Sequence, residues 1–449
     1  GGALQATIDL ESDLGDLSGS GAVSDWSGAL PDRIELDMKV ADLAAAKLSG
    51  DTALGPMSFT LVADATGLKS TVREGTLTFT PTRLSYHHHD LSSLRLNADV
   101  HDDSVHAELK SDADAAALDL LVRGRWPEAG DSLAMDLELV LRRLHLDELG
   151  LMDQVLRADG RITGRLAFLS PTRGRASLQA PGLHLFNDQR SYRAEHFTLN
   201  GLLDTDSTAV ELDCDVARVT YHANLSLDST EQLLRERLLG AFEEPYRFKP
   251  PPGRRIDLKV DLPGTERVGT LLLPELHALE LKRLEAHYDS DRDALLVDVD
   301  LPQLDYGGVV TQGLLLHIDA TGPKLKGQLN VLRVVRDSLH LDDLVLEASN
   351  APGALRTSLR MRDGEVDRYR IGVDLRRQGD VPVLHVQEDL VLDRKAWQAA
   401  AGNALYLDPQ GIRAEEFILS NGAQRVELRT VGDGTHLDIA GFELARMTR

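Results

Sequence analysis

The chain has 449 residues, of which 42% are hydrophobic and only 4% are aromatic, and its formal net charge is -23. This hydrophobic content excludes a largely disordered chain. The negative charge argues against a nucleic-acid partner and against an anionic membrane surface, because both would repel the protein.

Alternating apolar and polar residues predict β-strands through most of the first half of the chain. The alternation is clearest over residues 33–40 and 133–141. A period of two places every second side chain on the same face of a strand. We therefore expect one apolar face lined by Ile34, Leu36, Met38, Val40, Leu133, Met135, Leu137, Leu139 and Leu141.

Three consecutive histidines, His87, His88 and His89, are the most conspicuous candidate metal ligands. On a strand, His87 and His89 would point to the same side. Two such histidines need a third ligand to hold a metal, and none lies nearby in the sequence. We therefore predict a solvated strand end and no metal site.

One helix is predicted near the middle of the chain, over residues 229–242. Ser229 and Gln232 have the spacing of a capping box. Leu234, Leu238 and Phe242 recur at helical spacing and share one face. Because so few helices are available to pack against that face, we expect it to lie on the apolar sheet as a plug.

A proline-rich run at residues 250–254 follows this helix and predicts a stiff linker. We expect it to separate a first segment, residues 1–249, from a second, residues 255–449. Strand alternation resumes at once in the second segment. Its predicted apolar rows are Ile256, Leu258, Val260, Leu262, Leu295, Val297, Val299, Leu301, Tyr369, Ile371, Val373 and Leu375.

Asp289, Asp291 and Asp293 have the spacing of the first ligands of an EF-hand loop. The sixth position is Ala294 instead of glycine, and the twelfth is Asp300 instead of glutamate. We therefore predict a hairpin turn without calcium.

The C-terminal region combines turn signals with a short repeat. A short helix is expected from Asp393 to Gly402. Residues 408–411 and Asn421-Gly422 then predict two turns joining three short strands over residues 405–428. The sequence RAEEFILSNG at 413–422 repeats RAEHFTLNG at 193–201, which favours a modular β-array.

An antiparallel sheet with one apolar face must cover that face, and the predicted helices are too few to do so. Either two sheets close on each other, or one curled sheet surrounds something apolar. The sequence contains no motif typical of nucleotide binding, of zinc-dependent hydrolases or of a nucleophilic serine. We expect no catalytic residue, no enzymatic activity and no cofactor.

Several stretches resemble the TamB family (translocation and assembly module) of the AsmA-like superfamily, in its Bacteroidota-type branch. They are LELVLRRLHLDELGL at 137–151, the strand pair and helix at 210–242, and residues 397–428. The resemblance implies an elongated repeating β-groove (β-taco) with an apolar concave face. It also implies transfer of phospholipids between inner and outer membranes, and support of outer-membrane protein assembly.

The same resemblance implies a periplasmic location and partners outside this sequence. An N-terminal segment would anchor the protein in the inner membrane. A C-terminal region would bind an outer-membrane assembly-type β-barrel partner. Because the sequence begins at Gly1 without a methionine, we expect it to be part of a longer protein that carries these segments.

Two other functions stay open on the sequence. A β-sandwich array would serve as a structural stalk or adhesin, with closed, dry cores. A β-solenoid acting on polysaccharide would gather acidic residues on one strand face.

Overall fold

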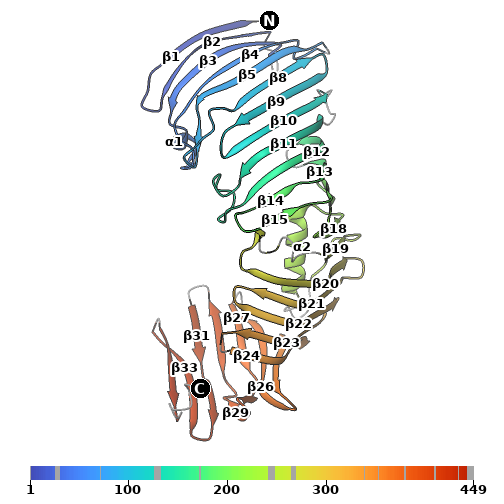
Figure 1. Ribbon diagram of the computed structural model, residues 1–449. Coiled ribbons are helices and arrows are strands. Elements are labelled where there is room, and N and C mark those ends of the chain that lie inside the picture. Colours follow the sequence, from blue (N-terminus) through green and yellow to red (C-terminus); the bar gives the residue numbers. More distant parts are fainter. Residues whose placement is uncertain are drawn as a thin grey trace. The chain divides into compact units, whose positions relative to one another are not determined.

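The protein is all-β in the computed structural model, and 32 strands belong to one antiparallel sheet (Figure 1). In the described part of the chain, helices α1 (Ala45–Ser49) and α2 (Leu227–Gly240) are short. The predicted fold class, antiparallel strands with few short helices, is confirmed. The structure describes residues 2–25, 31–70, 72–125, 133–170, 173–240, 248–263, 269, 271–337, 339–351, 353–378, 381–408, 411–432 and 434–441.

The chain divides into two compact units. Unit 1 comprises Gly1–Thr205, Ala209–Arg218 and Thr270–Pro274, and unit 2 comprises Asp206–Thr208, Val219–Gly269 and Glu275–Arg449. The linker predicted at residues 250–254 therefore lies within unit 2. The reason is that α2, which precedes this run, packs on the strands that follow it.

Unit 1 is a meander in which each long strand pairs antiparallel with the next one. The pairing runs β1–β2–β3–β4–β5–β8–β9–β10–β11–β12–β13–β16. These strands are β1 (Ala3–Leu10), β2 (Asp16–Ser24), β3 (Arg33–Leu43), β4 (Met57–Thr66), β5 (Glu74–Arg83), β8 (Arg95–His101), β9 (Ser104–Asp112), β10 (Ala116–Arg125), β11 (Leu133–His145), β12 (Arg157–Ser170), β13 (Arg173–Gln179) and β16 (Phe197–Leu203).

Small hairpins accompany this meander. They are β6 (Ser85–Tyr86) with β7 (His89–Asp90), and β14 (His184–Phe186) with β15 (Ser191–Arg193). Strands β17 (Thr208–Cys214) and β18 (Arg218–Ala223) follow, where the chain passes from unit 1 to unit 2.

Unit 2 begins as a second meander, β19–β20–β21–β22–β23–β24–β25–β26. Its strands are β19 (Arg255–Leu262), β20 (Leu276–Asp289), β21 (Ala294–Tyr306), β22 (Val309–Thr321), β23 (Lys324–Arg336), β24 (Leu339–Ala351), β25 (Ala354–Asp363), β26 (Val366–Gln378), β27 (Val381–Val386), β28 (Asp389–Leu392), β29 (Lys395–Ala399), β30 (Ala404–Asp408), β31 (Gly411–Glu415), β32 (Phe417–Asn421), β33 (Gln424–Val431) and β34 (Gly434–Ala440).

The same branching of the sheet occurs in both units. In unit 1, β12 pairs with both β13 and β14, and in unit 2, β26 pairs with both β27 and β28. The repeated sequence follows each branch. Its alanines, Ala194 and Ala414, are 3% and 6% exposed. The repeat noted in the sequence thus marks a repeated structural element.

The predicted turns are largely confirmed. Asn421-Gly422 closes the hairpin of β32 and β33, with Gly422 at φ 58°. Residues 290–293 form the turn between β20 and β21, which is the predicted hairpin turn. Residues 409–410 lie outside the described ranges. The stretch 405–428 holds four strands instead of three, because Glu416 at φ 44° interrupts the predicted middle strand.

The helix predicted from Asp393 to Gly402 is wrong. Asp393 and Arg394 form a turn at φ 49° and 62°, and residues 395–399 form β29. Trp397 is 5% exposed and lies across from Leu390 of β28. Trp397 and Ala399 are both buried and lie two residues apart, which is the spacing of one face of a strand.

Helix α2 begins earlier than predicted. It starts at Leu227, and the Ser226 hydroxyl oxygen accepts a hydrogen bond from the Ser229 backbone N–H at 3.3 Å. Ser226 is therefore the N-cap, and the predicted capping box starting at Ser229 does not form. The Gln232 side chain instead donates to Glu236 within the helix.

Candidate functional site: an apolar trough

The sheet of unit 1 aligns apolar side chains from successive strands into continuous rows on one face. We call one of these rows of directly paired residues the central lane. It crosses the strands from β1 to β12 and consists of Ile8, Gly19, Met38, Leu61, Phe79, Leu96, Leu109, Leu120, Leu139 and Ile162.

A second lane runs beside the central lane on the same face, because residues two apart on a strand point the same way. Its members are Ala6, Gly21, Leu36, Ala63, Leu77, Ala98, Ala107, Val122, Leu137, Gly164, Leu178 and Leu199. All of these residues are apolar or glycine. Together the two lanes form an apolar floor without a charged residue.

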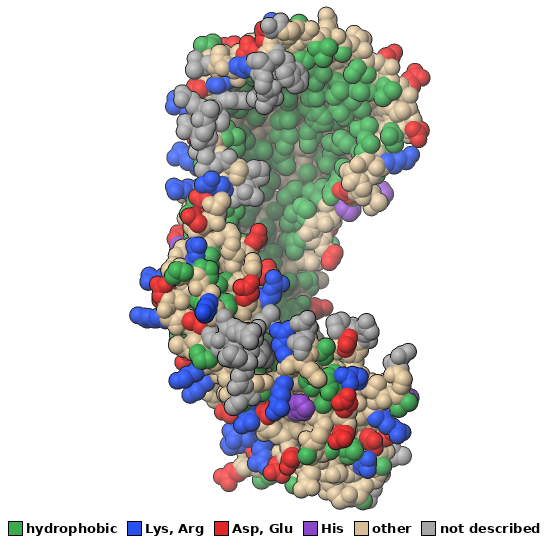
Figure 2. Space-filling view, turned by 180° about the vertical axis from the view of Figure 1, so that it is seen from behind, with side chains coloured by type: hydrophobic (Ala, Val, Ile, Leu, Met, Phe, Trp, Pro, Cys, Tyr) green, Lys and Arg blue, Asp and Glu red, His purple; other side chains and the backbone are tan. Residues whose placement is uncertain are grey.

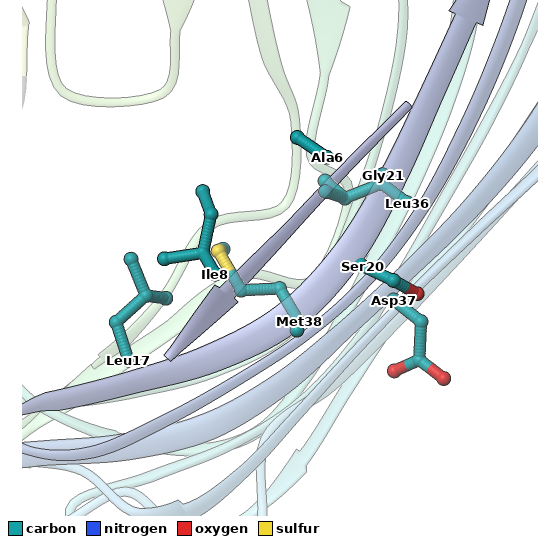
Figure 3. A pocket seen from close by; sticks show the side chains of 9 residues that line it. Ala6, Ile8, Leu17, Ser20, Gly21, Leu36, Asp37 and Met38 are labelled. Atoms are coloured by element: carbon teal, nitrogen blue, oxygen red, sulfur yellow. The ribbon is translucent and has the colours of Figure 1, made fainter. Parts of the chain in front are cut away.

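This floor lies in a hollow. Figure 2 shows hydrophobic side chains gathered in the concave surface of unit 1. Close by, Ile8, Leu17, Leu36 and Met38 line a small pocket in it (Figure 3). Asp37, the residue between Leu36 and Met38, points away from the pocket.

The predicted apolar rows of unit 1 lie on this face. By cross-strand register, the row of β3 from Ile34 to Val40 and the row of β11 from Leu133 to Leu141 share it. Val40 and Leu141 are buried, at 5% and 7% exposure. The other predicted residues are half-buried. Half-burial arises because neighbouring strands cover the flanks of each side chain while its tip stays in the hollow.

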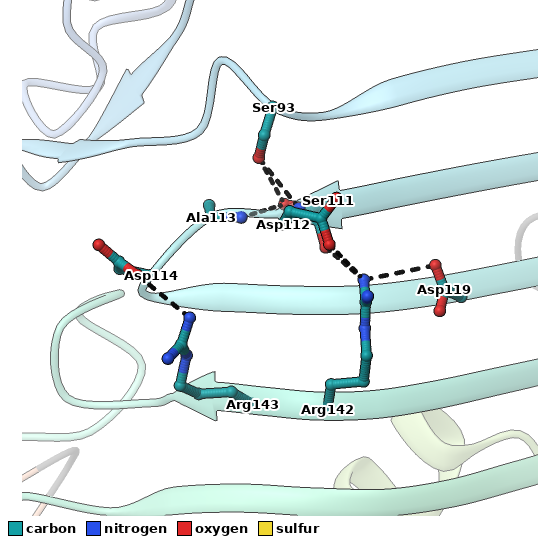
Figure 4. A network of polar contacts seen from close by, with 8 residues as sticks. All are labelled: Ser93, Ser111, Asp112, Ala113, Asp114, Asp119, Arg142 and Arg143. Carbon is teal, nitrogen blue, oxygen red and sulfur yellow. Dashed lines mark hydrogen bonds and ion pairs between the residues drawn. The ribbon is translucent and has the colours of Figure 1, made fainter.

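The opposite face of unit 1 is polar and held together by ion pairs. Arg165 Nε lies 2.8 Å from Asp136 across β12 and β11. Arg142 Nη2 lies 2.9 Å from Asp112 and 3.4 Å from Asp119, which joins β9, β10 and β11 (Figure 4). Exposed pairs of this kind contribute at most about 1 kcal/mol each. These charged side chains keep this face hydrated, and the apolar lanes lie on the other face of the sheet.

Sequence reasoning missed the glycines on the apolar face. A β-carbon at Gly164 would overlap the Leu178 side chain and lie 2.6 Å from the Ser177 carbonyl oxygen. Glycine is therefore needed where the concave side brings neighbouring strands close. Glycines spaced by two within strands, such as Gly19 and Gly21, are the signal that could have revealed this.

Unit 2 carries a corresponding apolar face. Its central lane runs from β19 to β26 through Val260, Leu284, Val299, Leu316, Leu329, Leu346, Leu359 and Ile371. The predicted rows of β19, β21 and β26 all contribute to this face: Ile256, Leu258, Val260, Leu262, Leu295, Val297, Val299, Leu301, Tyr369, Ile371, Val373 and Leu375.

Helix α2 covers one edge of this second face. Leu233 and Leu234 pack with Ile256, Tyr288 and Leu295, which lie in one cross-strand row. This row is buried, whereas Val260 and Leu284 of the central lane stay half-buried. The other two predicted plug residues, Phe242 and the side chain of Leu238, lie outside the described part of the chain.

The three histidines do not share one strand face. His87 and His88 have φ values of 46° and 69° and form the turn of the β6–β7 hairpin. His89 Nδ1 lies 3.4 Å from Glu148, whose other oxygen lies 2.7 Å from His145 Nδ1. Within the described ranges, no group of three or more potential ligands is arranged to hold a metal ion.

These observations define the class of protein: an open antiparallel β-sheet with one apolar and one polar face in each of two units. Comparisons with protein-family models, with curated proteins and with solved structures find no match for the chain. Across the ranges described, the helices are too short or too polar to span a membrane.

Proposed function

We propose that the apolar face of each unit forms a trough that binds the acyl chains of phospholipids and passes them from strand to strand. The observation that carries this proposal is the central lane of unit 1. It is continuous over ten strands, apolar throughout and half-open to the hollow. A closed β-sandwich would instead bury such a row completely.

Hydrophobic burial supplies the energy for this function. Moving a buried CH₂ group into water costs about 0.8 kcal/mol, so a sixteen-carbon chain costs over ~10 kcal/mol. A floor without charged or polar side chains keeps that cost low at each step. Leucine, valine and alanine suit it because they provide apolar area without specific polar contacts.

The resemblance to the TamB family supports the same function and extends it. On that basis we propose a protein of the bacterial periplasm that conducts phospholipids between inner and outer membranes. Its partners would be the inner membrane and an outer-membrane assembly-type β-barrel, reached through segments outside this sequence. The function requires no catalytic step, metal or cofactor.

Mass spectrometry of lipid extracted from the gently purified protein tests the proposal. We expect phospholipid in the extract at one or more molecules per chain. Protein that carries none, and that binds none from phospholipid vesicles, would contradict the proposal and favour a stalk or adhesin.

Two adjacent substitutions show where the lipid binds. Leu96 lies in the central lane, whereas Asn97 is exposed on the polar face of the same strand. Leu96→Asp and Asn97→Asp each add one carboxylate, one residue apart. We expect lipid retention to fall in Leu96→Asp and to stay unchanged in Asn97→Asp. Equal retention in the two variants would place the lipid elsewhere.

A further inference from the structure

Helix α2 is held on the apolar face of unit 2 by a buried cation. The Arg237 side chain is 1% exposed, although it is among the most polar side chains in proteins. Its Nη2 donates to the Gly322 carbonyl at 2.8 Å, and its Nε lies 2.7 Å from Asp293 Oδ1. Both partners belong to turns of the sheet: Asp293 ends the β20–β21 turn, and Gly322 lies in the β22–β23 turn.

The surroundings of this pair are apolar. Leu233 and Leu234, on the same helix, pack against Ile256, Tyr288 and Leu295. The Arg237 guanidinium carbon lies 5.9 Å from the centre of the Phe248 ring. The Tyr288 hydroxyl is buried without a hydrogen-bond partner among the described residues. Burial, and after it the nearby Asp293 carboxylate, raises the pKa of Tyr288 to about 12.

An ion pair is a poor device for stability in such a place. Removing both charges from water costs nearly as much as their attraction returns, and well-packed apolar residues would often hold the helix better. The pair does, however, make the contact of α2 all-or-none, because breaking it leaves a charge buried in an apolar site. Buried pairs of this kind suit an element that has two defined positions.

We infer that α2 is a lid on the trough of unit 2, latched by Arg237 and Asp293. In its closed position it covers the row of Ile256, Tyr288 and Leu295, which acyl chains would otherwise reach. When α2 lifts, this row joins the half-open central lane beside it. The inference rests on the proposed function, because it assigns to the helix control over lipid binding at the same trough.

Two variants should have opposite effects on the closed position of α2. Asp293→Asn removes the counter-charge and keeps the shape, so the ion pair between Arg237 and residue 293 is lost in the closed position. The double variant Arg237→Met/Asp293→Asn removes both charges, and asparagine tolerates the φ of 44° at position 293, so this variant should hold the helix closed. Asp337→Asn is the matched control, because Asp337 is an exposed residue of the β23–β24 turn.

Hydrogen exchange of the full chain measures the lid directly. In Asp293→Asn we expect amides of residues 227–240 to exchange at least about tenfold faster, while β19–β23 keep their protection. The amides of α2 should exchange no faster in the double variant than in the wild type. In the control Asp337→Asn they should exchange at the wild-type rate. If the strands lose protection together with α2 in Asp293→Asn, the helix is part of the core and the inference is overturned.

Lipid crosslinking separates this inference from the proposed function. A photo-crosslinker at Leu295, under the lid, should capture phospholipid from vesicles more in Asp293→Asn than in the wild type, and least in the double variant. A crosslinker at Leu109 in unit 1 should capture lipid equally in all three. Capture at Leu109 without a response at Leu295 overturns the lid alone, whereas no capture at either position overturns the trough itself.

Discussion

Gly19 of β2 lies directly across from Met38 of β3 in the central lane of unit 1. A β-carbon on Gly19 would overlap the Asp37 carbonyl oxygen and lie 3.0 Å from the Met38 Cα. At Gly21, two residues along on the same face, the nearest atom would be 3.5 Å away. The two backbones therefore approach each other more closely at Gly19 than at Gly21.

Gly19→Ala should loosen the first strands, and Gly21→Ala should not. Forcing a methyl group against backbone atoms costs about 1–3 kcal/mol. We expect faster hydrogen exchange of β2 and β3 amides in Gly19→Ala only. Equal exchange in the two variants would show that the strands are not packed this closely.

Ile256 and Leu258 offer a test of which parts of the trough are open. They lie in one row of β19, but Ile256 is 5% exposed under α2 and Leu258 is half-buried. A carboxylate in a closed apolar site is far more costly than one that stays partly hydrated. Ile256→Glu should therefore lower the urea midpoint of unit 2 strongly, whereas Leu258→Glu should lower it little and still abolish lipid transfer. Comparable losses of stability in both would indicate a closed core.

The sequence predicted the strands and the apolar rows because alternation with a period of two is a local signal. It did not predict β29, since Trp397 and Ala399 acquire their strand partner only through the hairpin with β28. It also did not predict the N-cap at Ser226. The burial of Arg237 was missed because it depends on contacts with turns that lie 56 and 85 residues further along the chain. Which apolar row is covered and which is open is likewise a tertiary property.

Asp374 should contribute stability that is lost in acid. The Arg356 guanidinium, 3.0 Å away, and the Gln387 amide hold the pKa of the Asp374 carboxyl below its ordinary value, against the opposing effect of burial. Because the folded-state pKa is the lower one, the contribution is complete above the unfolded-state pKa and disappears as the pH falls through the folded-state pKa.

Asp374→Asn should thus destabilise unit 2 at neutral pH and differ little from the wild type in strong acid. Urea midpoints measured from about pH 7 down to about pH 3 check this. A constant difference between variant and wild type across that range would contradict the assignment.

The repeated alanines test whether the two units unfold separately. Ala194 belongs to unit 1 and Ala414 to unit 2, and both are buried. Replacing either one by leucine should cost about 1–3 kcal/mol through overpacking. We expect Ala194→Leu to accelerate exchange in β14–β16 only, and Ala414→Leu in β30–β32 only. Acceleration in both units from one substitution would show that they are coupled.

Leu120 and Leu121 provide the most direct test of the trough, because they are adjacent, identical in chemistry and on opposite faces of β10. Leu120 lies between Leu109 and Leu139 in the central lane, whereas Leu121 lies between Glu108 and Glu138 on the polar face. A photo-crosslinker at position 120 should capture phospholipid in cells, and the same group at position 121 should not. Equal capture at both positions, or capture at 121 alone, would contradict the proposal that acyl chains lie on the concave apolar face.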